Sequence, residues 1–294
     1  MTPEPSPTQM APLTATLHDA RPCHLGEGAF WHPEREQLFW FDILGHRLLS
    51  RAGDTPLAWD MGECASAAGW IDRDTLLIAT ETGLWRFDIA SGARRLICAL
   101  EAEDPATRSN DGRADPQGGF WIGTMGKAAE DGRGAIYRYH MGEVRRLYGA
   151  LSIPNSICFA PGGEAAYFTD TKVGQIFRVP LDPEGWPAGD PVPFVDVAAQ
   201  GASPDGSVTD AEGGLWNAQW GSARVVRYAP DGRTDRIVTL EGRHASCPAF
   251  GGPGLKTLFV TSAREGIAAP DAAQGCTYAL VQDIAGRPEP RVRP

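Results

Sequence analysis

One short apolar run recurs six times along the chain, and this recurrence limits the possible folds more than any other feature. The runs begin at Leu38, Leu76, Phe120, Ala166, Leu215 and Leu258, with successive starts 38, 44, 46, 49 and 43 residues apart. A turn rich in Asp, Pro or Gly precedes each run, and a second strand-like segment follows it, usually opened by Gly. A unit of about 40–50 residues built from strands and tight turns is typical of a four-stranded propeller blade.

The repeat therefore predicts an all-β fold, a six-bladed β-propeller with four-stranded antiparallel blades. No helical period interrupts the repeat, and the chain carries 35 Gly, 24 Pro and 9 Trp, which suits turns and pleated, half-buried surfaces. We expect residues 14–294 to form a single domain. We expect residues 1–13, which hold four prolines, to form a flexible N-terminal tail. The segment near 14–20 should supply the outer strand of the last blade and so close the ring.

Composition and charge narrow the classes of partner. The formal net charge of −10 argues against binding to nucleic acid or to an anionic membrane, because both require a basic surface. No apolar run approaches the roughly 18 residues that a spanning helix needs. Residues 1–13 lack the apolar stretch of a secretory signal, and the six cysteines are scattered singly. We therefore expect reduced thiols and a cytoplasmic protein, either monomeric or weakly homo-oligomeric.

Four polar residues occupy a similar place in different repeats. Glu27 and Asn155 each lie 11 residues before an apolar run, and Asn110 and Asp205 each lie 10 residues before one. In a propeller this place is the start of the innermost strand, at the mouth of the central channel. The spacing therefore predicts that the four side chains converge on one point. Each of them alone also fits ordinary turn chemistry, as in Asn-Gly, Asp-Gly and Pro-Asn sequences.

Convergence of Glu, Asn, Asn and Asp would create a ring of hard oxygen donors. Such a set suits Ca²⁺, Mg²⁺, Mn²⁺ or Fe²⁺ better than a softer, thiolate-seeking ion. A carboxylate at a narrow channel mouth also needs a cation or strong donors beside it. We expect one divalent cation here. Zn²⁺ stays among the candidates, because the sequence does not identify the metal.

Five segments carry a resemblance to a known family. They are Leu25-Gly26-Glu27-Gly28, Arg108-Ser109-Asn110-Asp111-Gly112, Gly123-Thr124-Met125, Ile153-Pro154-Asn155 and Pro204-Asp205-Gly206. In this order they resemble the characteristic segments of the senescence-marker-protein/gluconolactonase/regucalcin-like family, and the similarity extends over nearly the whole chain after residue 20. The resemblance implies a six-bladed propeller that holds one divalent cation and hydrolyses sugar-acid lactones.

The same resemblance implies roles for individual residues. Glu27, Asn155 and Asp205 would be the metal ligands, and Arg108 and Asn110 would contact the substrate.

Lys127 marks a departure from the pattern. Some members of the family carry acidic, substrate-contacting residues after the Gly-Thr-Met segment, whereas this chain continues Gly126-Lys127-Ala128-Ala129. Lys127 could donate hydrogen bonds to substrate hydroxyl groups instead, which leaves open which sugar fits. Arg108 also has an alternative role, in which it pairs with Glu103 or Asp104 at the surface.

The predicted reaction is hydrolysis of an aldonolactone to the aldonic acid. The cation would polarise the lactone carbonyl and activate a water molecule, and Asp205 is the candidate base as well as a ligand. Asp111, one residue beyond the converging position, fits a turn-forming side chain better than a ligand. His24 and His244 lie near the rim, where ordinary surface or packing roles are favoured for both.

Two alternatives stay open. A phosphotriesterase- or arylesterase-like metal hydrolase could use the same fold, and its channel should then be lined by apolar groups. A non-catalytic propeller that binds Ca²⁺ or protein is the second alternative, since a fold alone does not decide function. Arg108, Asn110 and Lys127 favour a polyol substrate, and hence a small sugar lactone as the ligand.

Overall fold

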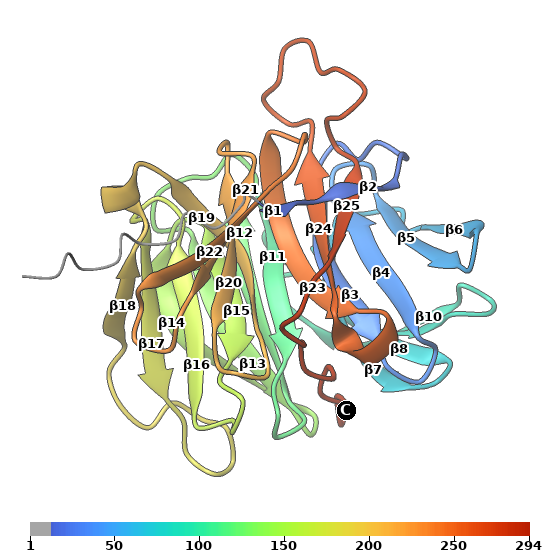
Figure 1. Cartoon of the computed structure of the whole chain (residues 1–294). Helices are drawn as coiled ribbons and strands as arrows, with labels where there is room; N and C mark the ends of the chain where they lie inside the picture. The colour runs from blue at the N-terminus through green and yellow to red at the C-terminus, as the bar shows by residue number, and fades with distance from the viewer. Residues whose placement is uncertain (1–12) are drawn as a thin grey trace, which may run out of the picture.

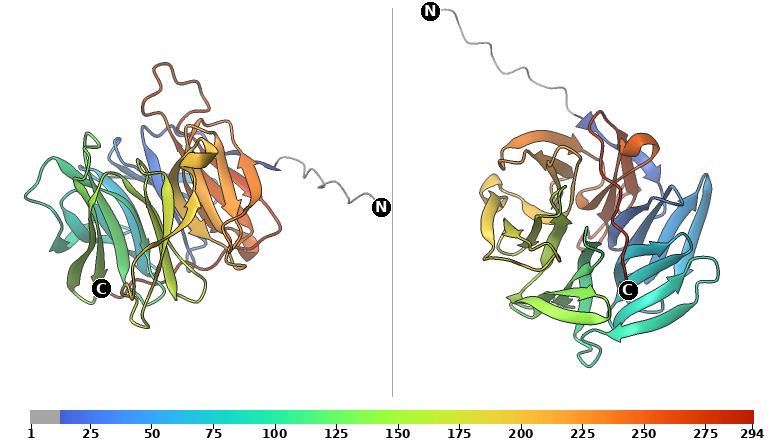
Figure 2. Two further views of the ribbon diagram at one scale, coloured as in Figure 1. Left: turned by 90° about the vertical axis from the view of Figure 1, so that its left-hand side faces the viewer. Right: turned by 90° about the horizontal axis from the view of Figure 1, so that it is seen from below.

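The computed structural model describes residues 13–294, which form six blades of antiparallel strands around a central axis (Figures 1 and 2). This arrangement confirms the predicted all-β six-bladed β-propeller. The expected flexible tail, residues 1–13, lies outside the described residues except for its last member, Leu13, which belongs to a strand. Within residues 13–294 no helix is long and apolar enough to cross a membrane.

Each of the first three blades contains four consecutive strands, ordered from the axis outward. Blade one contains β3 (Gly26–His32), β4 (Gln37–Asp42), β5 (Arg47–Ala52) and β6 (Thr55–Asp60). Blade two contains β7 (Ala65–Asp72), β8 (Thr75–Thr80), β9 (Gly83–Asp88) and β10 (Arg94–Ala99). Blade three contains β11 (Thr107–Ala114), β12 (Phe120–Gly126), β13 (Gly134–His140) and β14 (Glu143–Leu151).

The remaining blades repeat the pattern, with short 3₁₀ turns η1 (Ala198–Gln200) and η2 (Pro253–Leu255) between strands. Blade four contains β15 (Pro154–Phe159), β16 (Ala165–Asp170), β17 (Gln175–Pro180) and β18 (Val192–Asp196). Blade five contains β19 (Ser203–Thr209), β20 (Leu215–Trp220), β21 (Arg224–Tyr228) and β22 (Thr234–Thr239). Blade six contains β23 (His244–Gly251), β24 (Thr257–Ala263) and β25 (Thr277–Val281).

The N-terminal segment closes the ring. Strand β2 (Thr16–Asp19) pairs antiparallel with β25 as the fourth strand of blade six, which confirms the predicted closure. Strand β1 (Leu13–Thr14) was not predicted, and it pairs in parallel with β22 as a fifth strand of blade five. One short stretch of chain therefore covers the outer edges of two neighbouring blades and removes two exposed edges.

The core lies between blades, because the second strand of each blade is buried on both faces. This explains why the repeating runs are almost wholly apolar instead of alternating. Trp40, Trp121 and Trp216 lie in three of these strands and are fully buried. Trp121 meets Phe159 of the next blade edge to face, with ring centroids 5.5 Å apart. Such contacts fix the angle between neighbouring blades.

The innermost strand of every blade contains a register shift near its start. The shift occurs between Glu27 and Phe30 in β3 and between Asn155 and Cys158 in β15, and the other four innermost strands shift at the matching place. A bulge leaves residues unpaired and re-aims their side chains. At one end of the ring, the bulges of blades one, three, four and five therefore lie at the polar residues Glu27, Asn110, Asn155 and Asp205.

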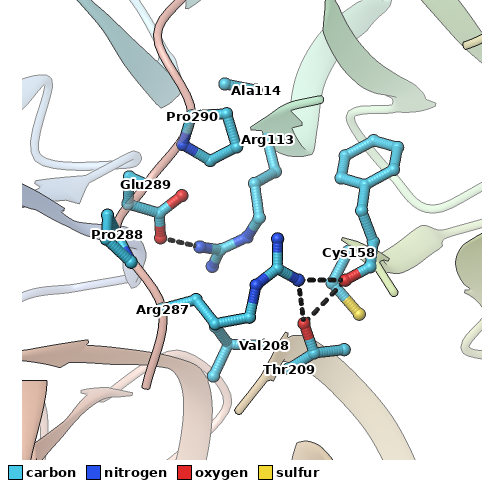
Figure 3. A pocket seen from close by; sticks show the side chains of 10 residues that line it. Arg113, Ala114, Cys158, Val208, Thr209, Arg287, Pro288, Glu289 and Pro290 are labelled. Atoms are coloured by element: carbon cyan, nitrogen blue, oxygen red, sulfur yellow. Dashed lines mark hydrogen bonds and ion pairs between the residues drawn. The ribbon is translucent and has the colours of Figure 1, made fainter. Parts of the chain in front are cut away.

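The C-terminal residues 285–294 cross the other end of the ring, as the view from below in Figure 2 shows. The backbone of this strap, the name used here for residues 285–294, bonds to Ala211 of blade five, Leu255 of blade six, Trp70 of blade two and Gly118 of blade three. A small cavity of about 20 Å³ lies beneath it (Figure 3). That volume holds a single water molecule and admits no substrate.

Candidate active site

A cavity of about 390 Å³ lies at the end of the ring opposite the strap. All six residues that the sequence analysis assigned to a site line this cavity, namely Glu27, Arg108, Asn110, Lys127, Asn155 and Asp205. They come from blades one, three, four and five. Two long loops between second and third strands, 127–133 and 264–276, border the cavity, and the second of these projects at the top of Figure 1.

The four residues expected to converge all lie at the bulges of innermost strands. They do not all occupy the same position relative to the bulge. Glu27 and Asn155 are the last paired residues before the bulge, opposite Phe41 and Thr169. Asn110 and Asp205 lie one residue further, within the bulge. The difference between 11 and 10 residues of spacing in the sequence reflects this offset.

Glu27 and Asp205 form a pair of adjacent buried carboxyl groups. Burial raises the pKa of Glu27, and the nearby Asp111 carboxylate adds to the effect. Burial likewise raises the pKa of Asp205, with repulsion from Glu27 as the next cause. Among residues 13–294 neither carboxylate forms an ion pair with Lys or Arg, and Glu27 accepts a hydrogen bond from the backbone amide of Gly28 at 3.0 Å. The free-energy cost of burying these two carboxylates is therefore not offset by an ion pair.

The two asparagine side chains are fixed next to this pair. Asn110 Nδ2 donates to Asn155 Oδ1 at 3.1 Å and to the carbonyl oxygen of Pro154 at 3.0 Å. Asn155 Nδ2 donates to Thr171 Oγ1 at 2.9 Å. The side-chain amide oxygen of Asn155 has a second lone pair that can bind a cation. Thr171, which the sequence analysis did not single out, therefore orients a predicted ligand.

Arg108 is buried and faces the site, which rules out the alternative surface pairing with Glu103 or Asp104. Its Nη1 donates to Asn110 Oδ1 at 2.8 Å and to the carbonyl oxygen of Ser109 at 2.9 Å. Asp104 instead pairs with Arg133, at 2.8 Å. Burial lowers the pKa of Arg108 below its usual value. The rest of the guanidinium fork borders the cavity and is free to bind a polar ligand.

Lys127 lies at the rim. Its Nζ forms an ion pair with Glu81 of blade two, and its backbone amide donates to the carbonyl oxygen of Ala106 at 2.8 Å. The lysine side chain is 41% exposed, whereas that of Glu81 is 17% exposed. Lys127 therefore reaches the cavity with part of its charge already compensated.

Asp111 has a more specific role than the turn-forming side chain that the sequence predicted. Its Oδ2 accepts a hydrogen bond from the backbone amide of Ile157 at 2.6 Å, which links blade three to blade four. Burial raises the pKa of Asp111 to about 6. The side chain is absent from the cavity lining.

Two further residues of the cavity escaped the sequence analysis. Trp220 ends β20, and Glu265 lies in the loop 264–276. Both come from elements other than the innermost strands, so a search for equivalent strand starts could not find them. His244 packs against Trp220 behind the cavity wall, whereas the carbonyl oxygen of His24 accepts the backbone amides of Arg264 and Glu265.

The donor set fits a hard divalent cation by its chemistry. Among the described residues no group of three or more His, Cys, Asp or Glu side chains gathers as a metal site. The set here has two carboxylates, from Glu27 and Asp205, and the amide oxygen of Asn155. These hard oxygen donors suit Ca²⁺, Mg²⁺ or Mn²⁺. The six cysteines are all free thiols, as predicted, and none lines the cavity.

The fold and the site together define a class, a six-bladed propeller whose polar cavity opens over converging carboxylate and amide groups. Residues 25–264 match the family model described as SMP-30/Gluconolactonase/LRE-like region. The chain belongs to this family, which confirms the resemblance in the sequence.

Individual relatives cover most of the chain. It is 43% identical to L-arabinolactonase of Azospirillum brasilense, over 83% of this chain and 82% of that protein. It is 32% identical to 6-deoxy-6-sulfogluconolactonase of Pseudomonas putida, over 92% and 95%. Among solved structures, a calcium-binding protein, regucalcin, from Agrobacterium tumefaciens superposes with a TM-score of 0.92 at 41% identity, covering 96% of this chain and 98% of that one.

Proposed function

We propose that this protein is a lactonase, which hydrolyses a sugar lactone to the sugar acid and holds one divalent cation through Glu27, Asn155 and Asp205. The observation that carries the proposal is the pair of adjacent buried carboxyl groups at the cavity, Glu27 and Asp205, with which no Lys or Arg among residues 13–294 forms an ion pair. The family membership and the lactonase names of two relatives support the reaction class. The similarity to regucalcin of Agrobacterium tumefaciens, a calcium-binding protein, supports a divalent cation.

Glu27, Asn155 and Asp205 would hold the cation, which would supply Lewis-acid polarisation of the lactone carbonyl and a lower pKa for a water molecule. Arg108 and Asn110 hold the substrate by hydrogen bonds to its oxygen atoms, with Lys127 contributing from the rim. Asp205 accepts the proton of the attacking water as the water oxygen bonds to the carbonyl carbon. The bond between that carbon and the ring oxygen then breaks. Asp205 passes the proton that it took from water to the ring oxygen, and the hydroxy acid leaves.

The polar wall of the cavity favours a polyol substrate over an aryl ester or a phosphotriester. Arg108 and Lys127 present hydrogen-bond donors, and Asn110 Oδ1 presents an acceptor, where the alternative hydrolase would need an apolar surface. We propose a cytoplasmic enzyme that acts as a monomer or a weak homo-oligomer. Size-exclusion chromatography with light scattering tests the oligomeric state.

The test of the proposed reaction is acid release measured at constant pH. Gluconolactone, xylonolactone and galactonolactone should be hydrolysed well above the uncatalysed rate, whereas an aryl ester and a phosphotriester should be poor substrates. Turnover of the aryl ester or the phosphotriester in preference to all three lactones would favour the alternative hydrolase. Metal binding without any turnover would favour the non-catalytic Ca²⁺-binding propeller.

A further inference from the structure

Trp220 is the aromatic member of an otherwise aliphatic and polar cavity lining among the described residues. It ends β20 of blade five, and its side chain is half-buried. None of the roles proposed above, neither metal ligation nor proton transfer, uses this side chain. An indole at the wall of a small, polar cavity presents an apolar face and one N–H donor.

His244 of blade six holds the indole in place. The two rings stack in parallel, with centroids 4.3 Å apart and an interplanar angle of 10°. His244 is itself buried, and burial lowers its pKa, so the ring behind Trp220 is neutral near pH 7. The stack therefore covers one face of the indole and restricts its rotation, without depending on a positive charge.

The indole N–H is also available to a ligand. Trp220 Nε1 has no hydrogen-bond partner within residues 13–294, and it is not sealed from solvent as the indole nitrogens of Trp40 and Trp121 are. The hydrogen-bonding groups of the cavity come from other elements, with Arg108 and Asn110 on β11 and Glu265 in the loop 264–276.

A cyclic sugar lactone is complementary to a cavity with one aromatic side chain, Trp220, and hydrogen-bonding groups on its other sides. Its hydroxyl groups project from the ring edge and need hydrogen-bond partners, whereas its C–H groups form an apolar face that packs on an aromatic ring. A rigid aromatic anchor also costs little conformational entropy when the ligand binds. An open-chain ester has no such ring face to present.

We propose that Trp220, positioned by His244, is a specificity-determining platform on which the C–H face of a sugar lactone ring packs. This inference rests on the proposed lactonase function. It adds that Trp220 recognises the ring of the substrate. Trp220 contacts the substrate, whereas His244 is a positioning residue that acts through Trp220.

The test compares two variants at each position. Trp220→Ala should raise KM for the hydrolysed lactones by about tenfold, the effect of losing roughly 1.4 kcal/mol of binding, and should change kcat much less. Trp220→Phe, which keeps an aromatic face, should stay within a few fold of the wild type. His244→Ala should raise KM, and His244→Phe should restore it because a phenyl ring can still stack. Trp85→Ala, a partly buried tryptophan on blade two and absent from the cavity lining, is the matched control and should leave KM unchanged.

Binding of a sugar lactam, a cyclic analogue that resists hydrolysis, gives a readout by calorimetry that does not depend on turnover. Weaker binding by Trp220→Ala and normal binding by Trp220→Phe are the expected results. A wild-type protein that hydrolyses the lactones while Trp220→Ala retains its KM and lactam affinity would overturn the platform alone. A wild-type protein that neither hydrolyses lactones nor binds the lactam would overturn both the platform and the proposed function.

Discussion

The carboxyl groups of Glu27 and Asp205 meet at the cavity floor, although one belongs to blade one and the other to blade five. Both are buried, burial raises the pKa of each, and repulsion from Glu27 raises the pKa of Asp205 further. Two buried carboxyl groups so close together cost stability unless a proton or a cation lies between them. The proposed metal site is a consequence of this relationship.

Replacement of Asp205 should abolish turnover. Asp205→Asn keeps the size of the side chain but removes both a metal ligand and the proposed proton acceptor, so kcat should fall by at least about a thousandfold. Asp231→Asn, in an exposed turn of blade five, is the matched control and should leave kcat unchanged. An Asp205→Asn variant that binds metal and retains its activity would remove Asp205 from the role of base.

The metal-free protein should lose stability as the pH rises. The folded-state pKa values of Glu27 and Asp205 lie above their unfolded values of about 4. The folded state therefore binds more protons, and stability falls as the pH rises from about 4 through the raised pKa values. Thermal unfolding of chelated protein between pH 5 and 8 checks this, since a bound cation should raise Tm more at the higher pH.

A double variant supplies the control for that pH dependence. Glu27→Gln together with Asp205→Asn removes both titrating groups and should flatten the fall in Tm with pH. Equal slopes for the chelated wild type and the double variant would show that the pair does not set the pH dependence of stability.

Arg108 should matter more than Lys127 for catalysis. Arg108→Lys removes the planar fork and one or two charged hydrogen bonds, so kcat/KM should fall by roughly 10- to 100-fold. Lys127→Met should cost less, because Glu81 already shares its charge. Steady-state kinetics on the preferred lactone measure both. A larger loss for Lys127→Met than for Arg108→Lys would reverse the proposed ranking of the two cations.

The strap should contribute strongly to stability through one buried ion pair. Glu289 in the strap pairs with Arg113 of blade three, and both side chains are less than 10% exposed. Glu289→Gln leaves the buried guanidinium without its carboxylate and should cost about 3–5 kcal/mol in urea unfolding. Glu143→Gln, which breaks the exposed pair with Arg145, should leave the unfolding midpoint near that of the wild type. Equal midpoints for the two variants would contradict this role of the strap.

The ring of six blades was predictable from the sequence because each repeat contains a buried apolar strand and a turn with characteristic turn residues. The apolar runs that start at Leu38 and Phe120 lie in second strands that are buried on both faces, so these strands are visible in the sequence. The ring closure by β2 followed from the same logic of unpaired edges. The parallel pairing of β1, at Leu13 and Thr14, has no such signal, because two residues are too few to show a period.

The site was predictable only where it repeats. Counting back from each run located Glu27 and Asp205, but it placed them in one register, whereas the bulge separates them by one position. Trp220 and Thr171 could not be found by counting, because their orientation depends on how neighbouring blades pack. The strap was missed for the same reason, since its partners lie far away in the sequence.

Metal content and lactone hydrolysis measured on the same samples test the central claim most directly. Chelated wild-type protein, and then the same protein with Ca²⁺, Mg²⁺, Mn²⁺, Fe²⁺ or Zn²⁺, is assayed on gluconolactone, xylonolactone and galactonolactone while bound metal is counted. We predict that activity is lost on chelation, returns with one bound ion per chain, and does not return in Glu27→Gln. Full activity in metal-free protein, or a fully active and metal-free Glu27→Gln variant, would contradict the account.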